Sequence, residues 1–111
     1  MARILIVDDE SAFRRAIRIA LRTRGHDVIE ACSGRDALSL LETEMPALIL
    51  LDWQMPGLDG LETCRAIRAS FDIPIVMVTS RGESGRGQAM AAGATGYVTK
   101  PFGLDELLAY L

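Results

Sequence analysis

The sequence predicts one α/β domain in which parallel strands alternate with helices. Short apolar runs bounded by polar or turn residues recur along the chain, as in buried parallel strands. Segments in which apolar residues repeat at helical spacing separate these runs, which is the pattern of βαβ units. With 111 residues, 50% of them hydrophobic, the chain can form one core and has no room for a second domain.

The apolar runs define the expected strands, at residues 3–7, 27–31, 47–51, 74–78 and 95–98. Right-handed crossovers between them give a three-layer sandwich, with helices on both faces of a five-stranded parallel sheet. The flavodoxin-like strand order 2-1-3-4-5 is the common solution at this length, and we adopt it from the fold class. In that order the first and third strands are neighbours.

Most of the connections between strands carry clear helix signals. The first helix ends before Gly25, which lies where a C-cap glycine belongs. Ser33 and Asp36 form a capping-box-like pair that marks the start of the second helix, which ends before Pro46. Two further helices are expected, over about residues 60–70 and from Leu104 to the end of the chain at Leu111.

The segment before the fifth strand is the weakest helix candidate. Gly82, Gly85 and Gly87 crowd its start, and each glycine inside a helix costs about 1 kcal/mol relative to alanine. We therefore expect a short or mobile helix within residues 81–93. A nucleotide-binding role for these glycines is disfavoured, because the chain has no GxxxxGK[ST] pattern and no GxGxxG after a strand.

Composition argues against several classes of protein. The net charge of −3 disfavours direct nucleic-acid binding by this chain, which would need a basic stripe. There is no apolar run of membrane-spanning length, and the first residues lead into a strand rather than a signal peptide. We therefore expect a cytoplasmic protein without membrane association. Cys32 and Cys64 have no metal-binding spacing and are expected to be reduced, semi-buried packing residues.

Acidic residues stand where two neighbouring strands leave the core. Asp8 and Asp9 follow the first strand, and Asp52 follows the third. Open α/β sheets build their sites at these carboxyl ends. Clustered carboxylates disfavour one another's ionised form, so they call for a cation, and Mg²⁺ is a hard ion that prefers oxygen ligands. Lys100, after the fifth strand, adds a positive charge.

The same residues suit phosphoryl chemistry. A carboxylate such as that of Asp52 can attack phosphorus to give an aspartyl phosphate. Phosphoryl transfer depends mostly on positioning and on neutralising charge, which Lys100 and Mg²⁺ would provide. Thr79, at the end of the fourth strand, offers a hydroxyl to a phosphoryl oxygen.

Taken in order, these residues resemble a family signature. Asp8 and Asp9, Asp52, Thr79, and the pair Lys100 and Pro101 are similar to the motif of the receiver domain of two-component response regulators. The resemblance covers essentially the whole chain, residues 1–111. It extends to the segments Met55–Gly60, Ala92–Ala94 and Lys100–Phe102.

The resemblance implies a phosphorylation-dependent signalling switch. Asp52 would be the phosphoacceptor, charged by a histidine kinase or a histidine phosphotransfer protein. Asp9, Asp52 and the backbone carbonyl of Gln54 would hold Mg²⁺, with Asp8 acting through water. The domain would catalyse only its own phosphorylation and slow dephosphorylation, and so would not be an enzyme acting on other substrates.

The resemblance also implies how the switch works. Tyr97 would turn inward when the hydroxyl of Thr79 is drawn toward the phosphoryl group, which changes the surface of the fourth helix and fifth strand. The Lys100–Pro101 peptide bond is expected to be cis.

Most arginines of the first helix should form a solvated face, and the alternative is a docking surface for the phosphodonor. These arginines are Arg14, Arg15, Arg18, Arg22 and Arg24.

Two alternative functions are weighed against this one. A haloacid-dehalogenase-type phosphatase also uses an aspartate nucleophile, but it needs a second aspartate where this chain has Gln54. A degenerate receiver would act as a phosphorylation-independent interaction module, which the intact acidic set argues against. A phosphorylation-dependent homodimer is a separate question. Winged-helix receivers often use two aspartates in intersubunit salt bridges, and Thr95 and Gly96 replace them here, which puts dimerisation of that type in doubt.

The final helix is shorter than is usual in the family, which is consistent with a truncated receiver. An effector, covalently attached or separate and with an output such as transcription regulation, would then lie outside the sequence.

Overall fold

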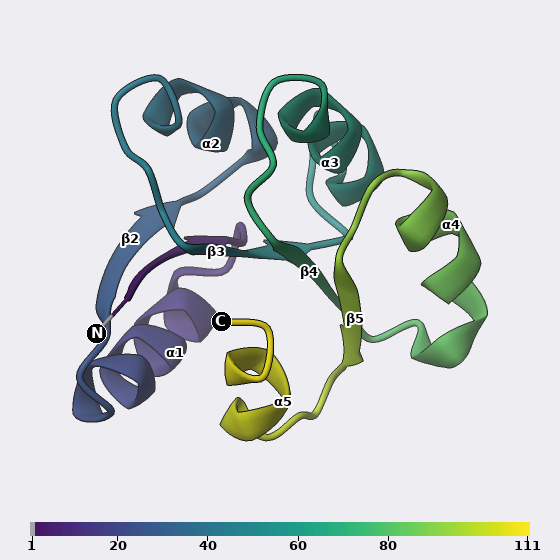
Figure 1. Cartoon of the computed structure of the whole chain (residues 1–111). Coiled ribbons are helices and arrows are strands. Elements are labelled where there is room, and N and C mark those ends of the chain that lie inside the picture. Colours follow the sequence, from purple (N-terminus) through teal and green to yellow (C-terminus); the bar gives the residue numbers. More distant parts are fainter. Residues whose placement is uncertain (1) are drawn as a thin grey trace.

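The computed structural model describes residues 2–111, which form one parallel sheet covered by helices on both faces (Figure 1). All strand pairs are parallel, and the strand order is β2-β1-β3-β4-β5, which confirms the predicted fold. The strands are β1 (Arg3–Val7), β2 (Asp27–Ala31), β3 (Leu48–Asp52), β4 (Ile75–Thr79) and β5 (Gly96–Thr99).

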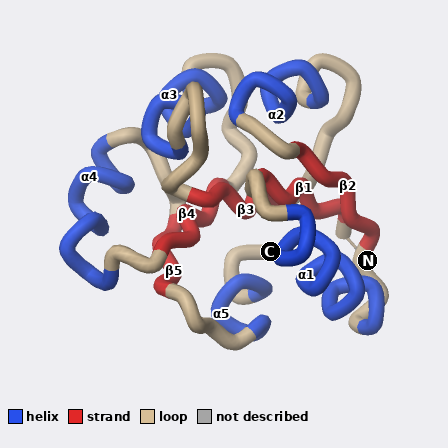
Figure 2. The backbone as a smooth tube through the Cα atoms, turned by 180° about the vertical axis from the view of Figure 1, so that it is seen from behind, coloured by secondary structure: helices blue, strands red, loops and turns tan. Residues whose placement is uncertain are grey.

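The helices lie in two layers. The elements are α1 (Ser11–Thr23), α2 (Gly34–Leu40), α3 (Gly60–Arg68), the 3₁₀ helix η1 (Gly82–Gly85), α4 (Arg86–Ala91) and α5 (Leu104–Leu108). Helices α1 and α5 cover one face of the sheet, and α2, α3 and α4 cover the other, as the view from behind also shows (Figure 2). Strand side chains alternate between these two faces, and the sheet therefore separates two hydrophobic cores.

Strands β3, β4 and β5 each run one residue further toward the carboxyl end than predicted. Asp52 pairs with Val78 and Thr79 with Thr99, so Asp52 and Thr79 are the last residues of their strands. Pro74, the expected first residue of β4, has no N–H to donate to a ladder, although its carbonyl accepts from the N–H of Ile49 at 2.9 Å. The shift places both polar side chains at the edge of the sheet.

The glycine-rich segment forms a short helix, as predicted. The 3₁₀ turn η1 leads directly into α4, which has 6 residues. Gly82 has a φ of +70°, a conformation that side-chain-bearing residues rarely adopt. The segment can therefore turn sharply out of β4 and still cover the sheet beside β5.

The expectation that the last helix continues to Leu111 is wrong. Helix α5 ends at Leu108, with Ala109 at the C-cap position. The N–H groups of Tyr110 and Leu111 donate to carbonyls three residues earlier, so the last turn is tighter than an α-helix. The ring of Tyr110 also covers Gly96, where an added Cβ would lie 2.2 Å from Tyr110 Cζ.

Two further expectations concern the cysteines and the membrane. Both thiols are free, as expected, but Cys32 is exposed rather than semi-buried because it follows β2 in the turn before α2, whereas Cys64 is buried on α3. Within residues 2–111, no helix combines the length and the apolar character needed to cross a membrane.

Candidate functional site

The sheet brings the predicted polar residues to one edge. Asp8 directly follows β1, Asp52 ends β3, Thr79 ends β4, and Lys100 follows β5. Because β1 and β3 are adjacent, the acids from both strands meet, as the predicted strand order requires. The four side chains come from four parallel strands that all end on the same side, where open α/β sheets hold their ligands.

Three carboxylates form a tight cluster at this edge. Asp8, Asp9 and Asp52 each contribute an oxygen, and these oxygens lie within 4.8 Å of one another. Asp8 is 1% exposed and Asp52 is 8% exposed, whereas Asp9 is open to solvent. The structure therefore brings together the acids that the sequence predicted, two of them largely out of water.

Lys100 lies between the two buried acids. Its Nζ is 3.6 Å from Asp8 Oδ2 and 3.6 Å from Asp52 Oδ1. These distances are those of ion pairs and exceed normal hydrogen-bond lengths. The ammonium also lies 4.3 Å from the ring centroid of Phe13, so a cation–π contact from α1 helps to place it.

Burial changes the acidity of the two aspartates. Desolvation, followed by the negative charge of Asp8, raises the pKa of Asp52 to about 6, although Lys100 acts in the opposite direction. Desolvation also raises the pKa of Asp8, against the N–H of Glu10 and the charge of Lys100. One lysine does not fully offset two buried carboxylates, and the cluster favours additional positive charge.

One atom in the cluster supports a metal site. Asp8 Oδ1 accepts a hydrogen bond from the N–H of Glu10 at 2.8 Å, whereas Asp8 Oδ2 is buried and has no hydrogen-bond donor among the described residues. Buried polar atoms usually have a partner. A hard divalent cation with oxygen ligands would fit this donor set of three carboxylates.

The remaining predicted site residues have distinct surroundings. The Thr79 hydroxyl is 1% exposed and accepts from the N–H of Arg81 at 3.0 Å. Gln54 is exposed in the loop after β3, and its role as a carbonyl ligand stays a prediction. The Lys100–Pro101 peptide bond is cis, as the resemblance implied.

Tyr97 points into the protein. It is 3% exposed, and its hydroxyl donates to the carbonyl of Gly82 at 2.5 Å. Its ring meets that of Trp53 edge to face, with centroids 6.3 Å apart. Sequence reasoning missed Trp53 and Phe13 as site neighbours. The signal for Trp53 was its position, since the chain's single tryptophan directly follows Asp52.

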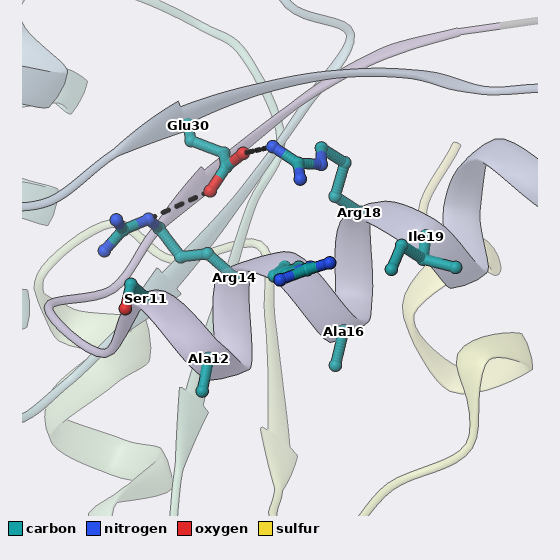
Figure 3. Close-up of a pocket in the computed structure, with 8 residues that line it drawn as sticks. Ser11, Ala12, Arg14, Ala16, Arg18, Ile19 and Glu30 are labelled. Atoms are coloured by element: carbon teal, nitrogen blue, oxygen red, sulfur yellow. Dashed lines mark hydrogen bonds and ion pairs between the residues drawn. The ribbon is translucent and has the colours of Figure 1, made fainter.

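The arginines of α1 do not form one uniform face. Figure 3 shows Arg14 and Arg18 reaching from α1 to the same carboxylate, Glu30 on β2. Arg14 also donates to the backbone carbonyl of Asp8 at 2.6 Å. Arg15 is exposed on the same helix, and no salt bridge forms to it within residues 2–111. Arg14 is therefore part of the support of the site, whereas Arg15 is exposed to solvent.

Two grooves flank α1 beside the acidic edge. One, of about 650 Å³, contains Arg14, Arg15, Arg18 and Ile19 (Figure 3). The other, of about 420 Å³, is mainly apolar and is lined by Phe13, Ile17, Lys100, Pro101 and Phe102. The surface around α1 is therefore basic in one groove and mainly apolar in the other, and Lys100 lines the second.

Comparison with known proteins identifies the type of domain. The sequence model of the response regulator receiver domain matches residues 4–111. Response regulator MprA of Mycolicibacterium vanbaalenii is 46% identical over 109 residues, which are 96% of this chain and 47% of MprA. The phosphate regulon transcriptional regulatory protein PhoB of Pseudomonas aeruginosa is 42% identical over 112 residues, 97% of this chain and 49% of PhoB. The chain thus spans about half the length of these curated relatives.

Solved structures agree with the sequence comparison. The receiver domain of the Francisella response regulator 1452 has a TM-score of 0.90 at 28% identity, and the match covers 98% of this chain and 92% of that one. The Vibrio cholerae chemotaxis protein CheY4 has a TM-score of 0.89 at 33% identity, covering 98% and 94% of the two chains. In both cases nearly the entire fold is shared.

Proposed function

The chain belongs to the family of response regulator receiver domains, and we propose that it is a phosphorylation-dependent switch of a two-component phosphorelay with Asp52 as the phosphoacceptor. The observation that carries this proposal is the placement of Lys100 Nζ 3.6 Å from Oδ1 of Asp52. A buried carboxylate beside a fixed ammonium can accept a group whose negative charge the ammonium then offsets.

The transfer step follows from these residues. An oxygen of Asp52 attacks phosphorus and forms the new P–O bond, while the P–N bond to the donor histidine breaks and the imidazole keeps its electron pair. Lys100 balances charge on the phosphoryl oxygens. Thr79 accepts from the N–H of Arg81, so its own proton is available to a phosphoryl oxygen.

Asp8, Asp9, Asp52 and the carbonyl of Gln54 would hold Mg²⁺. When bound, Mg²⁺ supplies positive charge against the phosphoryl oxygens. Two features support this assignment: the three carboxylates cluster within 4.8 Å, and Oδ2 of Asp8 is buried without a hydrogen-bond donor among the described residues. The domain accelerates only its own phosphorylation and slow dephosphorylation, because Gln54 stands where an acid–base aspartate would be needed for turnover.

The phosphodonor is a histidine kinase or a histidine phosphotransfer protein in the cytoplasm. Its helices would pack on α1 over the apolar groove of Phe13 and Phe102, with acidic side chains meeting Arg15. An effector, attached or separate, then reads the surface of α4 and β5, which changes with the orientation of Tyr97. Homodimers remain compatible with the fold, but not through acids at positions 95 and 96. Thr95 Oγ1 accepts from the N–H of Ile75, and Gly96 lies under Tyr110.

Intact mass spectrometry after incubation with Mg²⁺ and acetyl phosphate tests the proposal. The wild type should gain one phosphoryl group, and Asp52→Asn should gain none. Asp72→Asn removes an exposed carboxylate and serves as the matched control, which should be phosphorylated normally. No gain by the wild type, under conditions in which Mg²⁺ binding is measured, would show a degenerate receiver that acts as an interaction module.

A further inference from the structure

Two arginines and two aromatic rings form a continuous chain of contacts next to the acidic edge. The guanidinium carbon of Arg81 lies 4.5 Å from the Trp53 ring centroid, and that of Arg86 lies 5.1 Å from the Tyr97 ring centroid. Between them, Trp53 and Tyr97 meet edge to face. We call these four residues the aromatic clamp. Arg81 and Arg86 flank η1, so the clamp closes over both ends of this turn.

Trp53 links the clamp to the backbone of the acidic edge. Its N–H donates to the carbonyl of Val78 at 3.1 Å, and its carbonyl accepts from the N–H of Gly60 at 2.8 Å. The indole is 3% exposed. Because the residue is tied on both sides and directly follows Asp52, the indole has a defined position beneath η1.

Gly85 lets η1 approach the two rings. A Cβ added at this position would lie 2.5 Å from Trp53 Cζ3 and 2.7 Å from Tyr97 Oη, closer than carbon side-chain atoms pack. The Tyr97 hydroxyl meanwhile binds the carbonyl of Gly82. Any larger residue at position 85 would displace one of the rings or the turn.

Tyr97 packs within one hydrophobic core, and its three specific contacts belong to the clamp and to η1. They are the edge of Trp53, the guanidinium of Arg86 and the carbonyl of Gly82. Neither Asp52 nor Thr79 takes part in them. Glu83 in turn holds Arg86 in place, with its Oε1 2.9 Å from Arg86 Nη2.

We propose that the aromatic clamp presets the switch, so that Tyr97 is inward in most molecules before phosphorylation. A phosphoryl group can shift a two-state equilibrium only in molecules that still occupy the other state. The clamp therefore limits the amplitude of the response, and loosening it should enlarge that response. The part of this inference that concerns phosphorylation rests on the proposed function, whereas the preset orientation of Tyr97 does not.

Fluorine NMR of the full chain labelled with 3-fluorotyrosine tests the proposal. Tyr110→Phe assigns the signal of Tyr97, and a soluble paramagnetic reagent measures the exposure of its ring. Spectra are recorded alone and with Mg²⁺ and beryllofluoride, an analogue of the phosphoryl group. In the wild type, Tyr97 should be protected in both conditions and change little between them.

Variants of the clamp supply the decisive comparison. Arg86→Ala should raise the exposure of Tyr97 in the free protein, and beryllofluoride should then reduce it by a larger factor than in the wild type. Trp53→Leu and Gly85→Ala should act in the same direction. Gln88→Ala, an exposed change on the same helix, should resemble the wild type. Circular dichroism checks that each variant is folded.

Two results would overturn the proposal. One is a wild-type Tyr97 that is exposed alone and protected only with beryllofluoride. The other is a folded Arg86→Ala variant in which the exposure of Tyr97 is unchanged. The fluorine signal of bound beryllofluoride separates the two levels of inference. Its absence would contradict the proposed function, while the spectra of the free proteins would still decide whether the clamp presets Tyr97.

Discussion

The ammonium of Lys100 lies 3.6 Å from Oδ1 of Asp52, although Asp52 ends β3 and Lys100 follows β5, with β4 between these two strands. The same ammonium is placed by the face of Phe13 on α1. Lys100 therefore links the edge of the sheet to α1, and it connects the proposed phosphoacceptor with the surface on which a phosphodonor would dock.

Asp52→Asn should stabilise the metal-free protein at pH 7 by about 1–3 kcal/mol. Burial and the neighbouring Asp8 raise the pKa of Asp52 to about 6, so keeping this carboxylate ionised at pH 7 opposes folding. Urea unfolding in the presence of EDTA measures the change. Asp72→Asn, at an exposed position, should shift the free energy of unfolding little. A less stable Asp52→Asn protein would contradict the prediction.

The stability of the metal-free wild type should fall as the pH rises from about 4 to about 6. The unfolded chain releases the proton of Asp52 near the ordinary pKa of 3.8, whereas the folded chain keeps it until about 6. The protonated Asp52 therefore contributes its full stabilisation below the unfolded-state pKa of 3.8, and this contribution is lost as the pH rises through the folded-state pKa of about 6. The free energies of unfolding of the wild type and of Asp52→Asn are measured across this pH range, and their difference gives the contribution of Asp52. If this difference did not vary with pH, the pKa of Asp52 would not be raised in the folded protein.

Asp8→Asn should weaken Mg²⁺ binding by about 10–100-fold, the usual effect of losing a group that supports metal ligands. Calorimetric titration with Mg²⁺ at pH 7.5 gives the dissociation constant. Asp72→Asn again serves as the control for removing one negative charge. Equal affinities of Asp8→Asn and the wild type would exclude Asp8 and its buried Oδ2 from the metal site.

Charge reversal should affect two adjacent arginines differently. Arg15→Glu should slow phosphorylation by a histidine kinase that accepts the wild type, and should leave phosphorylation by acetyl phosphate unchanged. Arg14→Glu should slow both reactions, because Arg14 binds Glu30 and the carbonyl of Asp8 beside the site. Initial rates with each donor distinguish the two effects. Identical rate profiles for the two variants would contradict the separation of roles on α1.

Much of the site was predictable because each of its residues stands where an apolar run ends. Asp8, Asp52, Thr79 and Lys100 needed only the strand positions and the strand order to be brought together. The last helix was predicted less well, since apolar spacing alone does not show where packing of Tyr110 on Gly96 and tighter hydrogen bonds end α5. The exposure of Cys32 was missed for a similar reason, because spacing does not report how a turn faces solvent.

The sequence by itself determined the order of the elements and the edge at which the acids and the lysine gather. Hydrophobic periodicity decides where each strand leaves the core, and this is a local property of the chain. Only the tertiary structure decided that Arg14 supports the site while Arg15 forms no salt bridge within residues 2–111. It also decided that Trp53, Tyr97, Arg81 and Arg86 are in contact around η1. These relationships depend on side-chain orientations and on the close approach of η1, at Gly85, to one ring from the loop after β3 and one from β5. Such contacts exist only after the sheet and its helices have packed.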